Sequence, residues 1–215
     1  SYMGVKQGEP LSPLLFIFFI NDMYTQLQDD QLNSFTIYEI QLYLLLFADD
    51  TALFSYTKQG LQTLLNNLSM YCKKWDIHVN TNKTVAMVFH PGNRNVNVDL
   101  FYENEKLEVV HQFTYLGITL SSNGNFYKTQ KKLAEQSTKA MYALKSLFEV
   151  LDLQVCDKMK LFDAMIMPIL NYGSQIWGFH KSPDIERAYL KYLKNVVFQF
   201  FLLVLCLLLF MEFIL

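Results

Sequence analysis

An α+β fold is predicted from two features of the sequence. Strand-like and helical segments alternate over residues 1–122, and helical segments alone follow over residues 123–195. In addition, 52% of the 215 residues are hydrophobic and 15% are aromatic, which is enough to build the core of one domain or of two small ones. The sequence therefore predicts a chain that is folded over most of its length.

The first predicted element is a buried helix. An uninterrupted apolar run extends from Leu14 to Ile20, just after a turn-rich segment. Ser12 can cap such a helix, and Pro13 can occupy its first turn, where the backbone N–H that proline lacks has no helical partner in any case. Because the run carries no polar residue, we expect the helix to be surrounded by other parts of the protein.

A hairpin with an acidic tip is predicted next. Residues 36–47 are rich in β-branched, aromatic and leucine residues, and the same pattern resumes over residues 51–56, after Asp49 and Asp50. Adjacent aspartates are common at exposed turns, and this is the simpler interpretation of the pair. Two strongly apolar strands, however, hold both carboxylates in a rigid position, which suits a hard cation such as Mg²⁺. The pattern therefore also predicts a metal site at this tip.

The remaining elements follow from periodicity and turn residues. A change to a purely helical pattern is the single sign of a boundary near residue 122, and Pro168 predicts a kink or an end within the last helical stretch. The expected elements are a helix over 61–75, a strand over 84–89, a hairpin over 96–110 with its turn at 103–106, a strand near 113–117, a sheet end near 120, and helices beyond 124 and over 157–170.

The charge balance excludes a protein that binds nucleic acid through a bulk basic field. The net charge is −2, so any contact with nucleic acid has to come from local clusters of lysine and arginine. The 3 cysteines are odd in number, widely spaced and without Cys-x-x-Cys pairs, and the histidines show no ligand spacing. This excludes a disulfide framework, a disulfide-linked partner and a zinc module, and it indicates an intracellular protein of the nucleus or cytoplasm.

Four blocks stand in an informative order, namely Gly4–Phe16, Phe47–Asp50, Asn80–Thr84 and Tyr115–Gly117. In this order they resemble the palm of the reverse transcriptases, or RNA-directed DNA polymerases, of non-LTR (LINE-type) retrotransposons. In that family such blocks lie at the nucleotide and template, at the catalytic metals, near the phosphates and at the primer grip. A later segment, 168–177, is similar to the region that follows the palm.

The resemblance implies a fold and a function. The fold is a partial polymerase palm over residues 1–122, in which an antiparallel sheet carries packed helices, followed by a helical thumb- or connection-like region over residues 123–195. The implied function of the parent element is RNA-templated DNA synthesis by two-metal nucleotidyl transfer, with an RNA template and a DNA primer as partners. The chain is expected to be the C-terminal part of such a domain.

The resemblance also implies roles for single residues. The expected catalytic side chains belong to two acidic residues and one basic residue, and the acidic pair would bind Mg²⁺. Other residues would line the nucleotide pocket, form the primer grip or contact nucleic-acid phosphates. The catalytic set is Asp49, Asp50 and Lys83; the metal ligands are Asp49 and Asp50; the substrate-binding set is Gln7, Gly8, Phe47 and Ala48; the primer grip is Tyr115, Leu116 and Gly117; the backbone-contacting lysines are Lys128, Lys131, Lys132 and Lys139.

Each of these roles has a simpler alternative. Lys83 also fits the pattern of an ordinary solvated surface lysine. Tyr115 and Leu116 also fit the alternating core positions of a half-buried strand. The lysines between residues 128 and 145 lie opposite an apolar helix face, which is the ordinary exposed side of an amphipathic helix. The residue types alone leave these alternatives open.

The family pattern includes parts that this sequence does not contain. The palm uses a further aspartate from a strand upstream of the Gln7-Gly8 block, and the fingers supply basic residues for the triphosphate. The sequence starts within a motif and lacks the features of a secretory signal, which indicates a truncation. We therefore expect the isolated chain to be inactive as a polymerase and to bind Mg²⁺ weakly or not at all.

The last segment, residues 196–215, departs from the family. Val196–Met211 is uncharged and rich in Phe and Leu, and it is bounded by Lys194 and Glu212. Since a bilayer-spanning helix needs about 20 apolar residues, this apolar tail predicts a C-terminal transmembrane helix. The alternative function is therefore that of a non-enzymatic membrane-anchored protein, or of a decayed-element product whose tail is a frameshifted translation.

Overall fold

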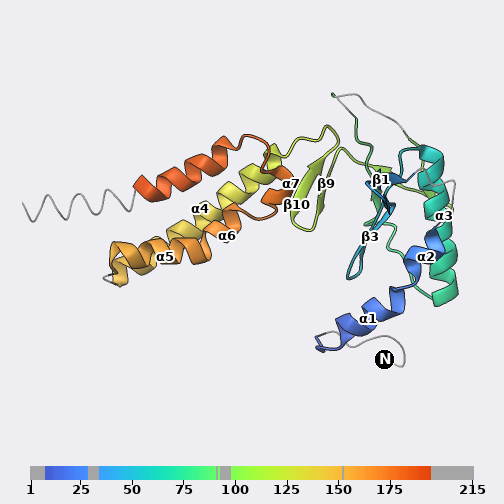
Figure 1. The fold of residues 1–215 in the computed structure, drawn as a ribbon, viewed down its shortest axis with the longest axis horizontal. Helices are drawn as coiled ribbons and strands as arrows, with labels where there is room; N and C mark the ends of the chain where they lie inside the picture. The colour runs from blue at the N-terminus through green and yellow to red at the C-terminus, as the bar shows by residue number, and fades with distance from the viewer. Residues whose placement is uncertain (1–7, 29–33, 91, 93–97, 152, 195–215) are drawn as a thin grey trace, which may run out of the picture. The chain divides into compact units, whose positions relative to one another are not determined.

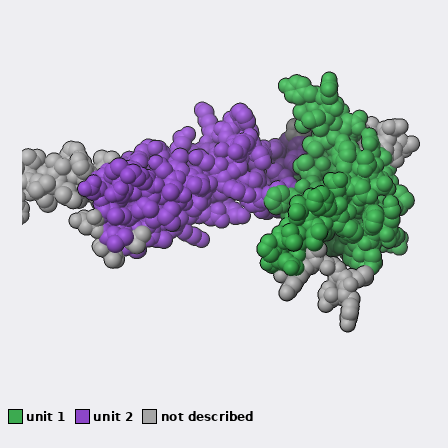
Figure 2. All heavy atoms as spheres, turned by 60° about the horizontal axis from the view of Figure 1, so that its bottom comes forward, with its two compact units in different colours: residues 1–88, 94–110 green, residues 89–93, 111–215 purple. Residues whose placement is uncertain are grey.

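The computed structural model describes residues 8–28, 34–90, 92, 98–151 and 153–194. The chain divides into two compact units: unit 1 consists of residues 1–88 and 94–110, and unit 2 of residues 89–93 and 111–215 (Figure 2). Both units contain helices and strands (Figure 1). The predicted α+β class is therefore confirmed.

The described residues of unit 1 form three helices and short paired strands. The pairs β1–β2, β3–β4 and β6–β7 are antiparallel hairpins, and β5 pairs with β8 in parallel. Among the described residues each sheet has two strands. The elements are α1 (Ser12–Ile20), α2 (Met23–Leu27), β1 (Phe35–Ile37), β2 (Ile40–Leu42), β3 (Leu44–Phe47), β4 (Asp50–Leu53), α3 (Lys58–Trp75), β5 (Val85–Ala86), β6 (Phe101–Tyr102), β7 (Glu105–Lys106) and β8 (Glu108–Val109).

The core of unit 1 forms around α3, which confirms the helix predicted over 61–75. The Thr57 side chain caps the helix start, where its oxygen accepts a hydrogen bond from the Gly60 N–H at 3.0 Å. The helix ends at Asp76, which adopts a left-handed conformation with φ of 54°. Its apolar face lies in one cluster with Met23 and Leu27 of α2. The amphipathic spacing thus gives both the helix and the face that it buries.

The helix predicted near residue 14 forms as α1, and Pro13 lies in its first turn as expected. The helix begins at Ser12, the expected cap residue, so that Leu11 stands at the cap position without a side-chain cap hydrogen bond. The predicted burial is wrong for the described residues: Leu14, Leu15, Ile17, Phe18 and Phe19 are exposed. An apolar run favours burial, but burial needs a neighbouring surface. Within the described residues, Ile20 lies in the core cluster and Phe16 packs against it, while the other apolar side chains of α1 are exposed.

The strand predicted over residues 36–47 is interrupted. The structure instead contains the β1–β2 hairpin, followed by β3 after Tyr43. The turn of this hairpin is Tyr38-Glu39, and Tyr38 has a φ of 55°. Bulky residues rarely adopt positive φ, and the segment has no Gly, Asn or Pro to mark a turn. The sequence therefore gave no local signal for the break.

The hairpin predicted over residues 96–110 is only partly correct. The turn is Glu103-Asn104 rather than the whole of 103–106, because Glu105 and Lys106 pair with Tyr102 and Phe101. The residues after the hairpin form β8, which pairs with β5. The strand predicted over 84–89 is correspondingly reduced to β5. A parallel pair joins distant segments, so local alternation does not reveal it.

Unit 2 packs a hairpin and several helices around two apolar clusters. Phe162, Ile166 and Leu170 are buried in one cluster with Leu144, and the Phe162 ring stacks on Tyr192 with centroids 4.1 Å apart. Ile118, Leu133 and Trp177 form the other cluster. The elements are β9 (Gln112–Tyr115), β10 (Ile118–Ser121), α4 (Tyr127–Val150), α5 (Val155–Met165), α6 (Met167–Leu170) and α7 (Ser174–Trp177), with residues 183–194 also helical.

The helical predictions for unit 2 are confirmed. The long helix expected beyond Gly124 is α4, and the sheet ends at Ser121, one residue after the predicted end. The stretch expected over 157–170 breaks at Ile166, and Pro168 lies in the first turn of α6. Proline is tolerated in a first turn, so it marks the point where a new helix begins.

Two further predictions concern a transmembrane helix and the cysteines. Residues 196–215, which carry the predicted transmembrane helix and the predicted membrane contact, lie outside the described residues. In the part of the chain that is described, no helix combines the length and the apolar character needed to cross a bilayer. Cys72 and Cys156 are both free thiols, the first buried and the second exposed.

Candidate active site

The two adjacent aspartates lie at the tip of the β3–β4 hairpin. The strands pair from Leu44–Leu53 at the base to Phe47–Asp50 at the tip, and Ala48-Asp49 is the turn. Ala48 has a left-handed backbone with φ of 50°, as expected for two-residue turns that match the twist of the flanking strands. The hairpin with an acidic tip is therefore present as predicted.

The pairing decides which way Asp50 faces. Leu44 and Leu46 belong to one face of β3, and Leu44 is buried in the core of unit 1 while Leu46 packs against it. Phe47 lies on the opposite face, and Asp50 is its direct cross-strand partner. Phe47, Asp49 and Asp50 are all exposed. The tip thus presents two carboxylates and an aromatic ring on a surface that faces away from the core.

The base of the hairpin is held by a buried tyrosine. Tyr43, directly before β3, is fully buried, and its hydroxyl donates to the Tyr24 carbonyl oxygen at 2.7 Å. Its backbone carbonyl accepts from the Phe54 N–H at 2.9 Å and extends the hairpin ladder. Burial, with a smaller effect of the neighbouring Tyr24, raises the pKa of Tyr43 well above its usual range. The hydroxyl therefore stays a neutral donor, and the apolar base fixes the acidic tip.

The site offers a partial fit to a metal ion. Where the chain is described, it contains no group of three or more His, Cys, Asp or Glu side chains that would hold a metal. Asp49 and Asp50 supply two adjacent carboxylates on a rigid turn. Mg²⁺ keeps several waters and is held by one or two carboxylates together with substrate phosphates. The pair therefore fits one part of a magnesium site and does not complete it.

Lys83 lies in a tight turn between α3 and β5. The Asn80 carbonyl oxygen accepts hydrogen bonds from the N–H groups of Lys83 and Thr84, at 3.0 and 3.1 Å, and from the Thr84 hydroxyl at 2.9 Å. The Lys83 side chain is exposed. None of the ion pairs between described residues joins it to Asp49 or Asp50. The turn thus presents an ammonium group to solvent on the same unit as the acidic tip.

Of the expected substrate-binding residues, Gly8, Phe47 and Ala48 belong to the described part of the chain. Gln7 lies outside the described residues. Gly8 is an exposed turn residue with φ of 85°, a conformation that glycine adopts without strain. Phe47 and Ala48 lie on the acidic hairpin, beside Asp49. The structure therefore gathers Phe47, Ala48 and the two aspartates at one tip.

The predicted primer-grip residues form the turn of the β9–β10 hairpin in unit 2. Leu116 and Gly117 are the turn residues, with φ of 46° and 80°. The Tyr172 hydroxyl donates to the Leu116 carbonyl oxygen at 2.8 Å, and the Trp177 indole N–H donates to the Tyr172 carbonyl oxygen at 2.8 Å. A Cβ on Gly117 would lie 3.1 Å from the Tyr172 ring. The turn is thus held from outside by a segment far along the chain.

Gly173 is the tightest point of this contact, and Gly173→Ala is expected to destabilise unit 2 by about 2–4 kcal/mol. Its φ is +65°, and a Cβ there would lie 2.5 Å from the Ile118 side chain. Gly124→Ala is the matched control, since Gly124 has φ of +73° with nothing within 4 Å, and it should cost only about 1 kcal/mol. Urea unfolding monitored by circular dichroism measures both. Equal losses would show that the contact with Ile118 is unimportant.

The four candidate lysines of α4 are all exposed. The Lys128 ammonium donates to the Gln112 side-chain oxygen, which joins the helix start to β9. Across the described residues none of the four forms an ion pair. The opposite face of α4 is buried with Leu133, Ala134 and Leu144. The described part of α4 thus carries the four predicted lysines on its exposed face.

Two residues near the Leu116-Gly117 turn were not assigned a role from the sequence. Tyr172 and Gly173 lie in the segment 168–177 that resembles the region after the palm, with no role of their own predicted. In the structure Tyr172 donates to the Leu116 carbonyl oxygen and Gly173 lies tightly against Ile118. Tyr172 is separated from Leu116 by 56 positions, so no local pattern connects them. A tyrosine directly before a glycine, after a short helix, is the one signal that the sequence offered.

A comparison with protein families identifies the chain. Residues 1–120 match the model of the family described as reverse transcriptase (RNA-dependent DNA polymerase). This range contains the acidic hairpin and the Lys83 turn, and it ends after the Tyr115–Gly117 block. The chain belongs to the reverse transcriptase family. The resemblance seen in the ordered blocks is thereby confirmed.

Three similar proteins come from mobile elements of insects. The "Probable RNA-directed DNA polymerase from transposon BS" of Drosophila melanogaster is 29% identical over 86% of this chain and 21% of that protein. The "RNA-directed DNA polymerase from mobile element jockey" of the same species is 26% identical over 86% of this chain and 20% of that protein. The "Retrovirus-related Pol polyprotein from type-1 retrotransposable element R2" of Popillia japonica is 28% identical over 81% of this chain and 29% of that protein.

These relatives extend the match beyond the family model into unit 2. They place this reverse transcriptase domain among those of the non-LTR, LINE-type retrotransposons. The chain spans about a fifth of the length of the first two relatives. The activity of a complete polymerase is therefore a proposal for this chain.

Proposed function

We propose that this reverse transcriptase domain contributes the palm carboxylates and the following helical region to a polymerase that copies an RNA template onto a DNA primer. The observation that carries the proposal is the rigid tip formed by Asp49 and Asp50, because a metal-dependent polymerase needs carboxylates held at a fixed position. In this proposal residues 1–122 are the palm and residues 123–195 are the thumb- or connection-like region.

Each residue of the site has its own role in the proposed nucleotidyl transfer. Asp49 and Asp50 would hold Mg²⁺, which when bound neutralises the charge on the phosphates and on the attacking oxygen. Lys83, presented to solvent by its turn, would lie near the triphosphate, where an ammonium group offsets developing negative charge. Phe47 and Ala48 flank the carboxylates and, together with Gln7 and Gly8, would border the nucleotide.

Unit 2 supplies contacts to the primer and its duplex in this proposal. The Leu116-Gly117 turn, held by Tyr172, gives a rigid surface on which the primer end can rest. Lys128, Lys131, Lys132 and Lys139 lie on one exposed face of α4, where ammonium groups can replace the counterions of phosphates. Positioning and charge neutralisation, rather than covalent chemistry by the protein, are what phosphoryl transfer requires.

We further propose that the 215-residue chain alone does not sustain DNA synthesis. The proposal is supported by the composition of the site: two carboxylates occur at the tip, and no third His, Cys, Asp or Glu joins them within the described part of the chain. A cation that holds its waters tightly and demands near-octahedral geometry binds such a pair weakly. Additional ligands would then come from a longer polypeptide.

Two measurements on the 215-residue chain test these proposals. Electron paramagnetic resonance of added Mn²⁺, a stand-in for Mg²⁺, should show weak binding that Asp49→Ala abolishes. Primer extension on an RNA template with Mg²⁺ should give no template-dependent product. Absence of any Asp49-dependent metal binding would contradict the proposed site. Processive synthesis that Asp49→Ala abolishes would instead support the site and refute the proposed inactivity of the chain alone.

A further inference from the structure

We propose that an open pocket at the start of α4 binds a phosphate group. The pocket lies within unit 2 and has a volume of about 380 Å³, within the range of small-ligand sites. It involves none of the residues proposed for catalysis, and its test does not require polymerase activity. It is lined by Asn123, Gly124, Asn125, Phe126, Tyr127, Gln130, His180 and Lys181.

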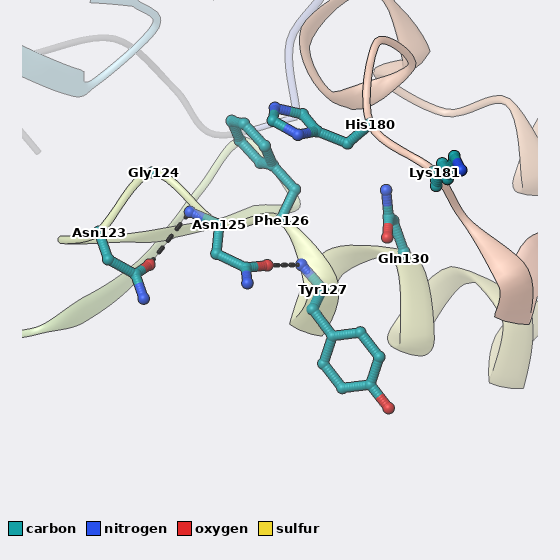
Figure 3. Close-up of a pocket in the computed structure, with 8 residues that line it drawn as sticks. All are labelled: Asn123, Gly124, Asn125, Phe126, Tyr127, Gln130, His180 and Lys181. Carbon is teal, nitrogen blue, oxygen red and sulfur yellow. Dashed lines mark hydrogen bonds between the residues drawn. The ribbon is translucent and has the colours of Figure 1, made fainter. Parts of the chain in front are cut away.

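Gln130 is the strongest indication of a ligand. Its side chain is buried, with only 3% of the residue exposed, and its amide nitrogen has no hydrogen-bond partner among the described residues. Figure 3 shows this nitrogen directed toward the space between Phe126 and Lys181. Buried polar groups are almost always paired, because an unpaired donor loses its bonds to water without replacement. The pocket therefore lacks an acceptor at this position.

The other polar groups of the pocket define the sign of the missing partner. None of the lining residues is acidic, and Lys181 supplies a positive charge. The long helix α4 begins at Tyr127, so its positive dipole end adds to the field. The arrangement selects an anion with several acceptor oxygens.

Two asparagines are oriented so that they add donors rather than acceptors. The Asn123 side-chain oxygen accepts from the Asn125 N–H at 3.1 Å, and the Asn125 side-chain oxygen accepts from the Tyr127 N–H at 2.6 Å (Figure 3). Both oxygens are thus used to shape the loop before α4. The amide NH₂ groups remain as donors, so the loop offers no competing acceptor from these side chains.

The rings beside these donors indicate that the phosphate belongs to a nucleotide unit. Phe126 and His180 lie with their ring centroids 5.7 Å apart and inclined at 48°, and both line the pocket. Aromatic faces stack on sugars and bases without sequence preference. The shared ligand chemistry is a nucleotide phosphate, supplied either by the backbone of a nucleic-acid strand or by a free nucleotide.

Thermal unfolding of the full chain tests the pocket itself. Sodium phosphate, compared with sodium chloride at equal ionic strength, should raise the Tm of the wild-type chain, because a ligand that binds only the folded state stabilises it. Lys181→Ala should weaken phosphate binding at least about tenfold. Lys160→Ala, which removes an exposed lysine of α5 outside the pocket, should leave the response unchanged.

Gln130→Leu is a second variant, and it should change the Tm without phosphate and the response of the Tm to phosphate in opposite directions. It removes the unpaired amide, so the Tm in chloride should rise, while the additional increase caused by phosphate should be lost. A purely structural glutamine would not link these two changes. The pocket assignment is overturned if phosphate raises the Tm equally in wild type, Lys181→Ala and Gln130→Leu.

Fluorescence anisotropy separates the two sources of phosphate. For a nucleic-acid strand, Lys181→Ala should weaken binding of a labelled oligonucleotide and lower the slope of log affinity against log salt by about one. For a free nucleotide, a nucleoside monophosphate should raise the Tm of the wild type, and oligonucleotide binding should be the same in wild type and Lys181→Ala. Both results support a phosphate pocket and differ only in its occupant.

Discussion

Asp49→Asn is expected to lower DNA synthesis at least about 100-fold in a complete polymerase that carries this chain. The substitution keeps the size of the side chain and removes the charge that holds a cation. Because Asp49 is an exposed turn residue, the folded state should be unaffected. Primer extension on an RNA template measures the loss, and thermal unfolding of the same preparation checks the fold.

The control for this prediction is Asp76→Asn. Asp76 is also exposed and ends α3 in a left-handed conformation with φ of 54°, which asparagine adopts readily. This variant should synthesise DNA at the wild-type rate with the same metal dependence. Unimpaired synthesis by Asp49→Asn would remove the acidic tip from the proposed mechanism.

Phe162→Ala is expected to destabilise unit 2 by about 3–5 kcal/mol, the cost of deleting a fully buried aromatic ring. Phe162 has no exposed surface, and its ring contacts Tyr192 at 4.1 Å and Tyr189 at 5.7 Å between centroids. Tyr192 in turn donates to the Lys158 carbonyl oxygen at 2.7 Å. The substitution therefore leaves a cavity and loosens a residue that ties α5 to the last described helix.

Urea unfolding followed by tyrosine and tryptophan fluorescence measures this change. The matched control is Phe179→Ala, because Phe179 lies in the same unit with 92% of its surface exposed, and its loss should change stability by no more than about 0.5 kcal/mol. A loss below about 1 kcal/mol for Phe162→Ala would mean that the cluster around this ring does not carry the stability of the unit.

Long helices were predictable because their signal is repeated many times. The apolar face of α3 recurs through Leu61, Leu64, Leu65 and Leu68, and the end near Trp75 was found within one residue. The break at Ile166 could be predicted from Pro168, since proline restricts the backbone directly. In each case the physical cause lies within a few residues of its effect.

Short strands were less predictable. β5 and β8 have two residues each and pair in parallel, and a two-residue strand contains no period to recognise. The β1–β2 turn depends on Tyr38 in a left-handed conformation that its residue type disfavours. The conformation belongs to a two-residue turn between short strands, and no residue type in the segment marks that turn.

The candidate site was predicted as a set of blocks and not as an arrangement. The order of the blocks indicated the acidic tip and the Leu116-Gly117 turn. It did not indicate Tyr172, whose hydroxyl fixes that turn, or Gln130, whose unpaired amide marks the pocket. Both depend on side chains that meet only after folding, and neither residue type is unusual at its position.

The parallel pairing of β5 with β8 has a consequence for the order of folding. The two strands are separated in the chain by the β6–β7 hairpin. Their pairing therefore closes a loop, and the loss of chain entropy comes before the contacts between the strands can form. The β3–β4 hairpin has no such cost, since its strands adjoin a two-residue turn. The acidic tip is therefore expected to form early, and the strand pair beside the Lys83 turn late, during the folding of unit 1.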